Sequence, residues 1–315
     1  MENTEIQLFI SKYKQEYNIY ERFCDYLEKQ FKELIKETDV YYYELSSRIK
    51  TLDSILEKME RKSLPLQDIH DIIGFRIITL FKRDVCTICD MVRNTFQIAW
   101  EDDKAQEKTD NCFGYLSIHF QLKVPEEWIK SPTDSQYSKL DVELQVRTFS
   151  QHVWAASSHL LQYKRDSSVP YVMRRNINRL AAVLEIVDDE LESILNAKEC
   201  YRLSLQETSN NEKECSETTL NSILLEHILD ELFLKENKKL QEPFDDLLEE
   251  LSFCGINTVG QLRELLSSEM EGIRKKEAKK SGEKGEPFYS YAGKLRLAMK
   301  SRFPVLYKKM RNPNK

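Results

Sequence analysis

The stretch Asp71-Ile-Ile-Gly-Phe-Arg-Ile-Ile-Thr79 decides the fold, because a continuous apolar run directly follows a carboxylate. Runs of this kind are typical of strands that are buried on both faces, so we predict a central strand over residues 72–80. Asp71 then lies where the chain enters this strand, and its carboxylate is carried by a rigid element of the fold.

Alternating polar and apolar residues predict two further strands. The first covers residues 115–124 and places Tyr115, Ser117 and His119 on one face. The second covers residues 141–148 and places Glu143, Gln145 and Arg147 on one face. Both strands therefore expose a polar face.

Apolar residues at helical spacing surround these strands. The predicted helical segments are 5–36, 51–62, 84–96 and 149–163. The aromatic stripe of the first helix is expected to be core, Asp84 is the predicted N-terminal cap of the third, and an acidic loop is expected at 101–111. Helices and strands thus alternate through the middle of the chain.

The chain becomes helical after Pro170. We predict a first domain over residues 1–170, a long helix over 171–205, a polar linker over 206–219 and an α-helical C-terminal extension over 220–315. The apolar stripe of the long helix, from Leu180 to Leu195, is expected to pack. Shorter helices are predicted at 220–240, 243–253, 258–268 and 291–302.

Composition argues against a secreted or membrane protein. The sequence shows no basic start followed by an apolar run, and no apolar stretch near the ~18 residues that span a bilayer, so we expect a soluble, cytoplasmic protein. Seven cysteines, an odd number, argue against a disulfide framework. Cys86 and Cys89 fit the core of a helix better than a metal site.

Charge is distributed unevenly along the chain. Residues 274–315 contain fourteen Lys or Arg and three acids, a net charge of +11, so residues 1–273 carry −17 in a chain of net charge −6. Such a basic segment suits an anionic partner, RNA first, but also a solvated tail or a tail that folds onto the acidic body.

Four residues form a phosphate-binding pattern. They are Arg48, Lys50, Ser54 and Lys58, which cluster around the start of the predicted helix 51–62. A triphosphate needs several cations that converge from one side, and Ser54 and Lys58 share a helix face. For basic residues alone, a solvated charged face is the competing interpretation.

Two carboxylates complement these cations. Asp71 and Glu143 arrive from separate strands, which is a usual arrangement for a magnesium ion in phosphoryl transfer. Either acid alone is more typical of a surface or capping residue. Tyr115 and His119 share a strand face, where the tyrosine ring could stack on a base and the histidine could hold a phosphate or a hydroxyl. The alternative interpretation of the tyrosine is a packing role.

The order of these motifs resembles the synthetase domain of the RelA/SpoT family. The matching motifs are Arg48-x-Lys50 with Ser54 and Lys58, Asp71-x-x-Gly74-x-Arg76, Gly114-Tyr115-x-Ser117-x-His119, Glu143-x-Gln145-x-Arg147-Thr148 and His152-x-Trp154 to His159, Tyr163 and Lys164. The resemblance covers about residues 40–165. It implies an α+β fold, a mixed β-sheet flanked by helices and related to the nucleotidyltransferases. It also implies transfer of the β,γ-pyrophosphate of ATP to the ribose 3′-oxygen of GDP or GTP, giving (p)ppGpp and AMP.

The resemblance further implies a role for each motif residue. Arg48, Lys50, Ser54 and Lys58 would bind the donor ATP. Asp71 and Glu143 would be the catalytic carboxylates that hold Mg²⁺, with Glu143 also suited to act as the base. Tyr115, His119, Gln145 and Arg147 would bind the acceptor nucleotide, and Arg76 would support the site.

Two positions depart from the family pattern, Phe113 where Asn is common and Ser158 where an acid is common. Both concern the acceptor pocket, so adenine nucleotides and the tRNA 3′ end stay open as acceptors. A non-catalytic nucleotide- or RNA-binding protein on the same scaffold stays open as well. The chain resembles a single-domain small alarmone synthetase without a hydrolase domain, and the sequence leaves homo-oligomer formation undecided.

Overall fold

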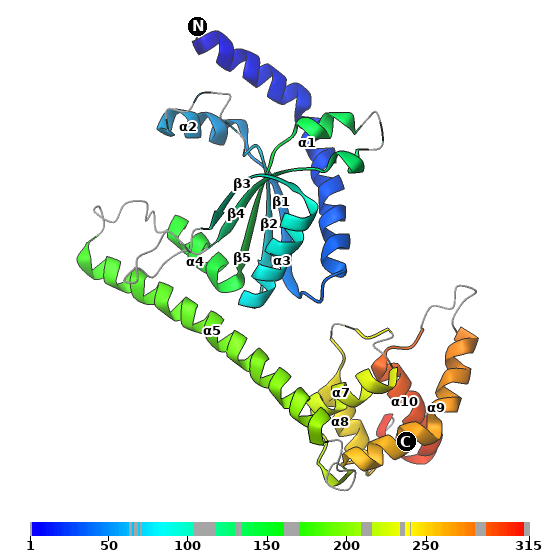
Figure 1. Cartoon of the computed structure of the whole chain (residues 1–315). Coiled ribbons are helices and arrows are strands. Elements are labelled where there is room, and N and C mark those ends of the chain that lie inside the picture. Colours follow the sequence, from blue (N-terminus) through cyan, green and yellow to red (C-terminus); the bar gives the residue numbers. More distant parts are fainter. Residues whose placement is uncertain are drawn as a thin grey trace. The chain divides into compact units, whose positions relative to one another are not determined.

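The computed structural model describes residues 2–62, 65, 69, 71–103, 117–129, 131, 134–160, 170–208, 216–233, 237–239, 241–280 and 288–311. The chain forms two compact units, Met1–Ile194 and Leu195–Lys315 (Figure 1). The boundary falls within helix α5 (Tyr171–Thr208). The domain limits expected from the sequence stay predictions, and residues 209–215 of the expected linker lie outside the described residues. Within the described ranges, no helix has the length and apolar character that a bilayer span requires.

In the described residues, the first unit contains a five-stranded sheet with the order β1-β2-β5-β4-β3. The strands are β1 (Tyr42–Ile49), β2 (Ile73–Thr79), β3 (Gln97–Asp103), β4 (Ile118–Lys123) and β5 (Val142–Thr148). The pair β2 and β5 is parallel, whereas the other neighbours are antiparallel. This mixed sheet with flanking helices confirms the α+β fold and the strand predicted at 72–80.

The register of the strands separates a polar face from an apolar face. The polar face carries Ser46 and Arg48 on β1, Gly74 and Arg76 on β2, Glu143 and Gln145 on β5, and His119 on β4. Because side chains alternate along a strand, Phe75 and Leu144 point to the opposite face, where both are buried.

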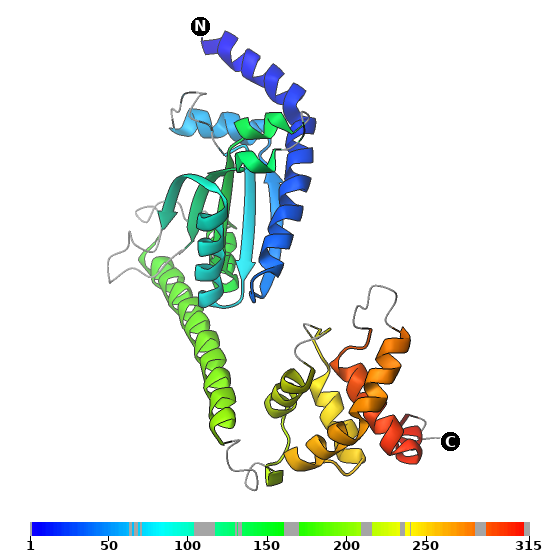
Figure 2. The ribbon, with the colours of Figure 1, turned by 45° about the vertical axis from the view of Figure 1, so that its right-hand side comes forward.

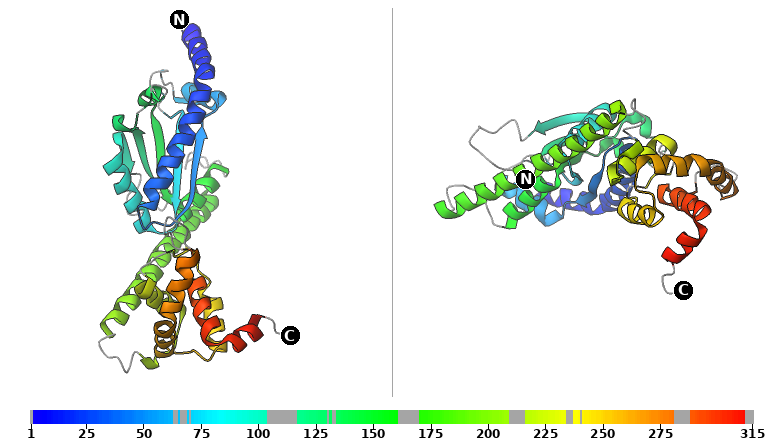
Figure 3. Two further views of the ribbon diagram at one scale, coloured as in Figure 1. Left: turned by 90° about the vertical axis from the view of Figure 1, so that its right-hand side faces the viewer. Right: turned by 90° about the horizontal axis from the view of Figure 1, so that it is seen from below.

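Helices α1 (Glu2–Lys36) and α3 (Lys82–Thr95) cover the apolar face (Figure 2, Figure 3). Phe31 of α1 is fully buried there, and its ring centroid lies 5.4 Å from that of Phe75 and 5.1 Å from that of Phe96. Burial of such a side chain contributes about 1.5–3 kcal/mol. The prediction that the aromatic stripe of this helix is core is confirmed for Tyr13 and Tyr20 but is wrong for Tyr17, which is exposed.

Helix α4 (Phe149–Leu160) directly follows β5, and it packs against the first part of α5 beside the C-terminal end of that strand. Trp154 of α4 packs against Ile177 and Ala181 of α5. Asp188 of α5 accepts a hydrogen bond of 2.6 Å from the Thr148 hydroxyl at the end of β5. The expected apolar stripe is wrong in part: Leu180, Val183, Val187 and Ile194 are exposed, because α5 turns a face with a buried carboxylate toward the unit.

The sequence predictions fail at two strands and at one cap. Strand β1 was not predicted, and β3 occupies the first part of the expected loop 101–111. Both are edge strands with a single neighbour, so their polar residues carry a weak strand signal. Helix α3 begins at Lys82 after Phe81, and Asp84 is a buried residue of its first turn rather than its cap.

The expectation that both cysteines of this helix lie in or near the core is wrong for one of them. Cys89 is buried, whereas Cys86 is exposed on the outer face of α3. Both thiols are free, as are the other described cysteines.

The second unit is helical, as expected. Its helices are α7 (Ser222–Phe233), α8 (Phe244–Phe253), α9 (Val259–Lys280), α10 (Tyr291–Arg302) and α11 (Pro304–Arg311). Helix α9 is longer than the predicted 258–268, and α11 follows the helix predicted to be last. Tyr291, Leu295 and Met299 of α10 are buried in the core of this unit.

The basic segment is therefore largely folded instead of forming a tail. Lys294 of α10 is buried with its ammonium 4.9 Å from the centroid of the Phe233 ring. Arg296 forms an ion pair of 2.6 Å with Glu250 of α8. Helix α10 thus packs onto an acidic part of the chain, which is one of the predicted alternatives, whereas the end of α9 is solvated.

Candidate active site

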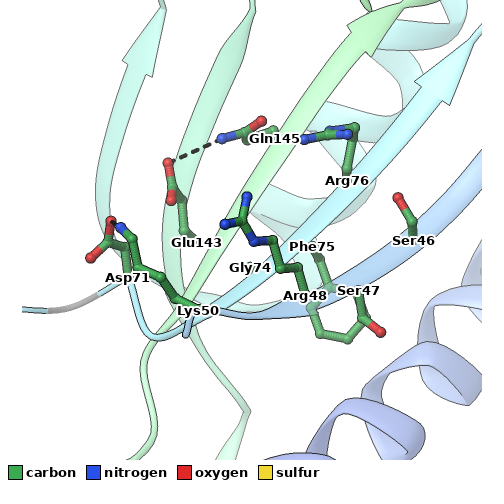
Figure 4. Close-up of a pocket in the computed structure, with 10 residues that line it drawn as sticks. All are labelled: Ser46, Ser47, Arg48, Lys50, Asp71, Gly74, Phe75, Arg76, Glu143 and Gln145. Atoms are coloured by element: carbon green, nitrogen blue, oxygen red, sulfur yellow. Dashed lines mark hydrogen bonds and ion pairs between the residues drawn. The ribbon is translucent and has the colours of Figure 1, made fainter. Parts of the chain in front are cut away.

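A pocket of about 400 Å³ opens on the polar face of the sheet, beside strands β1, β2 and β5 (Figure 4). Its lining consists of Ser46, Ser47, Arg48, Lys50, Asp71, Gly74, Phe75, Arg76, Glu143 and Gln145. This volume lies in the range of small-molecule sites, about 300–1,000 Å³. The pocket thus brings together Arg48, Lys50, Asp71, Glu143 and Gln145, which the sequence singled out from separate motifs.

Asp71 is the meeting point of two lysines. The ammonium groups of Lys50 and Lys58 each donate a hydrogen bond of 2.5 Å to Asp71 Oδ2. Burial would raise the pKa of Asp71, but the hydrogen bonds from the two lysines outweigh it and lower this pKa below its ordinary value. Asp71 is therefore an anion at neutral pH. Its other oxygen, Oδ1, is buried and has no hydrogen-bond partner among the described residues.

The turn between β1 and α2 (Leu52–Lys62) explains why the two lysines converge. Lys50 directly follows β1, and its N–H donates a hydrogen bond of 2.8 Å to the Ile72 carbonyl, next to Asp71. Thr51 then caps α2, since its hydroxyl accepts a hydrogen bond from the Ser54 N–H at 3.4 Å. Two helical turns after Lys50, Lys58 of α2 approaches the same carboxylate.

Glu143 has a different set of partners. Its Oε1 lies 3.2 Å from His119 Nδ1, and it accepts a hydrogen bond of 3.3 Å from the Gln145 amide. The hydrogen bond from His119 is the main cause that lowers the pKa of Glu143, whereas burial and the nearby charge of Asp71 raise it. His119 thus lies beside the carboxylate, although the sequence assigned it to the acceptor nucleotide.

The two carboxylates fit a magnesium ion that arrives with phosphates. Magnesium usually takes one or two protein carboxylates and completes its shell with water and substrate phosphates. Asp71 Oδ1 is buried and has no hydrogen-bond partner among the described residues, so a metal ion would give this oxygen the partner that it lacks. In the same described part of the chain, no cluster of three His, Cys, Asp or Glu side chains could hold a metal by itself. The pair therefore suits a shared site between protein and nucleotide.

The remaining predicted donor residues differ in their positions. Arg48 and Arg76 both line the pocket from neighbouring strands. Ser54 does not belong to the described lining, and its hydroxyl lies 2.8 Å from the hydroxyl of Thr51. The lining residues that the sequence did not single out are Ser46, Ser47 and Phe75, and the side chain of Phe75 lies in the core on the opposite face of the sheet. The alternation of polar residues at 44, 46 and 48 is the signal that could have found strand β1.

The residues that the sequence assigned to the acceptor nucleotide are described only in part. Tyr115, with Phe113 and Gly114, lies outside the described residues, as do Tyr163 and the side chain of His159. Arg147 is buried on the polar face beside α4. Burial lowers the pKa of His152, and the charges of Arg147 and Arg76 add to that effect. The polar face therefore continues from the pocket toward α4 with positive charge.

Comparison with known proteins places the pocket within a matched region. Residues 47–168 match the family described as "Region found in RelA / SpoT proteins". GTP pyrophosphokinase YjbM of Bacillus subtilis (strain 168) is 31% identical over 155 residues, which cover 48% of this chain and 70% of that protein. The chain belongs to the RelA/SpoT family. This confirms the resemblance that the motifs indicated.

Other members of the RelA/SpoT family match as well. GTP pyrophosphokinase YwaC of the same organism is 24% identical over 198 residues, covering 59% of this chain and 92% of that protein. Among solved structures, the crystal structure of small alarmone synthetase 1 from Bacillus subtilis is 26% identical, with a TM-score of 0.49, and covers 59% of this chain and 97% of that chain. The helices of the second unit lie outside the matched residues 47–168.

Proposed function

We propose that the protein transfers the β,γ-pyrophosphate of ATP to the ribose 3′-hydroxyl of GDP or GTP, forming (p)ppGpp and AMP. The observation that carries this proposal is the joint position of Asp71, Glu143 and several cations at one pocket. The names of the two Bacillus subtilis relatives, both GTP pyrophosphokinases, support a guanine nucleotide as acceptor.

The donor half follows from the cations. Arg48, Lys50 and Lys58 bind the triphosphate of ATP, and Ser54 contributes at the start of α2. Lys50 and Lys58 already converge on one oxygen at 2.5 Å, so a phosphate placed beside Asp71 lies within reach of both ammonium groups. Charge-assisted hydrogen bonds of this type are strong and shorter than neutral ones. Arg76 supports the same wall from β2.

The acceptor half follows from Glu143. Its lowered pKa keeps it anionic, and contacts from His119 and Gln145 hold it in one orientation. In the reaction, the acceptor 3′-oxygen forms a bond to the β-phosphorus of ATP, the bond from that phosphorus to the α,β-bridging oxygen breaks, and AMP departs with the oxygen. Glu143 takes the proton of the hydroxyl. Tyr115 stacks on the acceptor base, and Arg147 binds the acceptor nucleotide.

Magnesium belongs to this proposal through the two carboxylates. Asp71 and Glu143 would hold it, and when bound it neutralises the charge that develops on the transferred phosphates. The protein itself positions the reactants, which supplies much of the acceleration in transfers of this type.

A transfer assay tests the proposal. The protein is incubated with γ-labelled ATP and, separately, GDP, GTP, adenine nucleotides or tRNA, and the labelled products are resolved. Transfer to GDP or GTP is the expected result, and the Glu143→Gln variant should lose it. Transfer only to adenine nucleotides or to tRNA would select the alternative acceptors. Failure with every acceptor would reject the enzyme in favour of a nucleotide-binding protein.

An RNA partner for the basic segment needs a separate test. Because α10 is part of the core of the second unit, truncation at residue 274 would remove folded structure. Neutral substitutions at the exposed Lys276, Lys279 and Lys280 of α9 leave that core intact. Weaker and less salt-dependent binding of tRNA by this variant is expected if α9 contacts the RNA backbone.

A further inference from the structure

We infer that Tyr13 of helix α1 is a positioning residue for the donor site, acting through the backbone of Lys50. This inference rests on the proposed function, because it assigns Tyr13 a part in binding ATP. Tyr13 lies outside the matched segment 47–168, and the sequence suggested only a core role for it.

One hydrogen bond connects α1 to the site. The Tyr13 hydroxyl donates to the Lys50 carbonyl oxygen at 2.8 Å, across 37 positions of sequence. The side chain is only 6% exposed, and burial, assisted by the neighbouring Tyr17, raises the pKa of this hydroxyl. Tyr13 therefore keeps its proton and remains a donor.

The bond acts at a short and decisive connection. Only Lys50 and Thr51 join the end of β1 to the start of α2. The N–H of Lys50 is held by the Ile72 carbonyl at 2.8 Å, and its carbonyl is held by Tyr13. Both backbone polar groups of Lys50 are thus hydrogen-bonded, and one of the two partners, Ile72, is the neighbour of Asp71 in the sequence. Loss of the hydroxyl would leave this half-buried carbonyl without its partner, which would favour rotation of the peptide between Lys50 and Thr51.

Rotation of this peptide affects both lysines of the site. It changes the direction in which the Lys50 side chain leaves the backbone, and thereby its 2.5 Å contact with Asp71. It also tilts Thr51, which caps α2, and with it the helix that carries Lys58. Small displacements of groups that position phosphates are costly for the reaction.

Tyr20 provides a matched control on the same helix. It is 4% exposed, and its ring centroid lies 5.8 Å from that of Tyr13. Its hydroxyl donates to Glu16, within α1, at 2.8 Å. The Tyr13→Phe and Tyr20→Phe variants therefore each lose one buried hydroxyl from one aromatic cluster, and only the first loses a link to the site.

The experiment compares these variants as full-length chains. We measure the KM for ATP and for GDP, kcat, the melting temperature, and the affinity for a non-hydrolysable ATP analogue by calorimetry. Tyr13→Phe should raise the KM for ATP and lower the affinity for the ATP analogue, each by about tenfold, as expected for one lost hydrogen bond. The KM for GDP should not change. Tyr20→Phe should change neither, while both variants lose similar thermal stability.

A double-variant cycle tests the route through Lys50. In a Lys50→Met background, the further change Tyr13→Phe should raise the KM for ATP by a smaller factor than in the unmodified chain, because only the effect through α2 and Lys58 remains. The inference would be overturned if Tyr13→Phe and Tyr20→Phe had equal KM values for ATP, or if Tyr13→Phe raised the KM for ATP and the KM for GDP by the same factor. Activity of the unmodified protein would still support the proposed function in either case. If the unmodified protein transfers nothing, the proposed function fails, and analogue affinity still decides the role of Tyr13.

Discussion

Replacement of Asp71 by asparagine tests the centre of the proposed donor site. The change keeps the size of the side chain and removes the charge that holds Lys50 and Lys58 at 2.5 Å each. The side chains of the three residues are 17%, 21% and 24% exposed for Asp71, Lys50 and Lys58. In the variant, two ammonium groups remain close together without their counter-charge, so both stability and activity should fall.

The magnitude follows from this partial burial. A hydrogen bond to a charged group contributes about 1.5–3 kcal/mol, whereas an exposed ion pair contributes less than about 1 kcal/mol. Both lysines can turn toward solvent once the carboxylate is gone, so the losses do not add in full. We expect the free energy of unfolding at pH 7 to fall by about 2 kcal/mol.

The pH dependence has a definite sign. Because the lysines lower the pKa of Asp71, its stabilisation is present above the ordinary Asp pKa of about 3.9 and is lost as the pH falls through the lower folded value. The difference in stability between the two proteins should therefore narrow below about pH 4. Urea unfolding followed by circular dichroism, repeated across this pH range, measures it.

Activity should respond far more strongly than stability. Loss of one preorganised electrostatic group typically costs about 10²–10³-fold in rate, and we expect at least that for transfer from γ-labelled ATP. The control is Asp53→Asn, the same chemical change on an exposed residue of α2. Transfer by Asp71→Asn within tenfold of the unmodified rate, or a loss equal to that of Asp53→Asn, would refute the assigned role of Asp71.

Three further predictions concern the frame of the first unit. Phe31→Ala should lower the free energy of unfolding by about 3–5 kcal/mol in urea, because Phe31 is fully buried among aromatic rings, and a loss below about 1 kcal/mol would contradict this packing. Burial, aided by the charge of Glu192, raises the pKa of Asp84 to about 6, so the free energy of unfolding should decline as the pH rises from about 4 to 6. The Asp84→Asn variant should therefore have a free energy of unfolding about 1–3 kcal/mol higher than that of the unmodified protein at pH 7.5, and an equal one below pH 4. The free energy of unfolding of Gly74→Ala should lie within about 1 kcal/mol of that of the unmodified protein, since the new Cβ would meet the Arg48 and Glu143 carbonyl oxygens at ordinary distances of 3.8 and 3.9 Å. A larger loss in the same urea assay would count against this strand register.

Local pattern explains which elements were predictable. Strand β2 is buried on both faces and reads as a continuous apolar run, and the helices of the first unit show their spacing directly. Strand β1 is an edge strand that carries polar residues on the polar face of the sheet. Arg48 was therefore placed at the start of a predicted helix, although it belongs to this strand. The apolar residues of α5 were expected to pack, but Val183 and Val187 are exposed, since periodicity does not reveal which helix face finds a partner.

The sequence alone determined the types of residue at the site and their order along the chain, because motif spacing and strand alternation are local properties. It singled out Asp71, Glu143 and the cations of residues 48–58 as candidate site residues, and the order of their motifs indicated the family. Only the tertiary structure decided which groups touch: two lysines on one oxygen of Asp71, His119 beside Glu143, and Tyr13 on the backbone of Lys50. These contacts join distant segments through strand register and helix packing, and a linear pattern does not encode them.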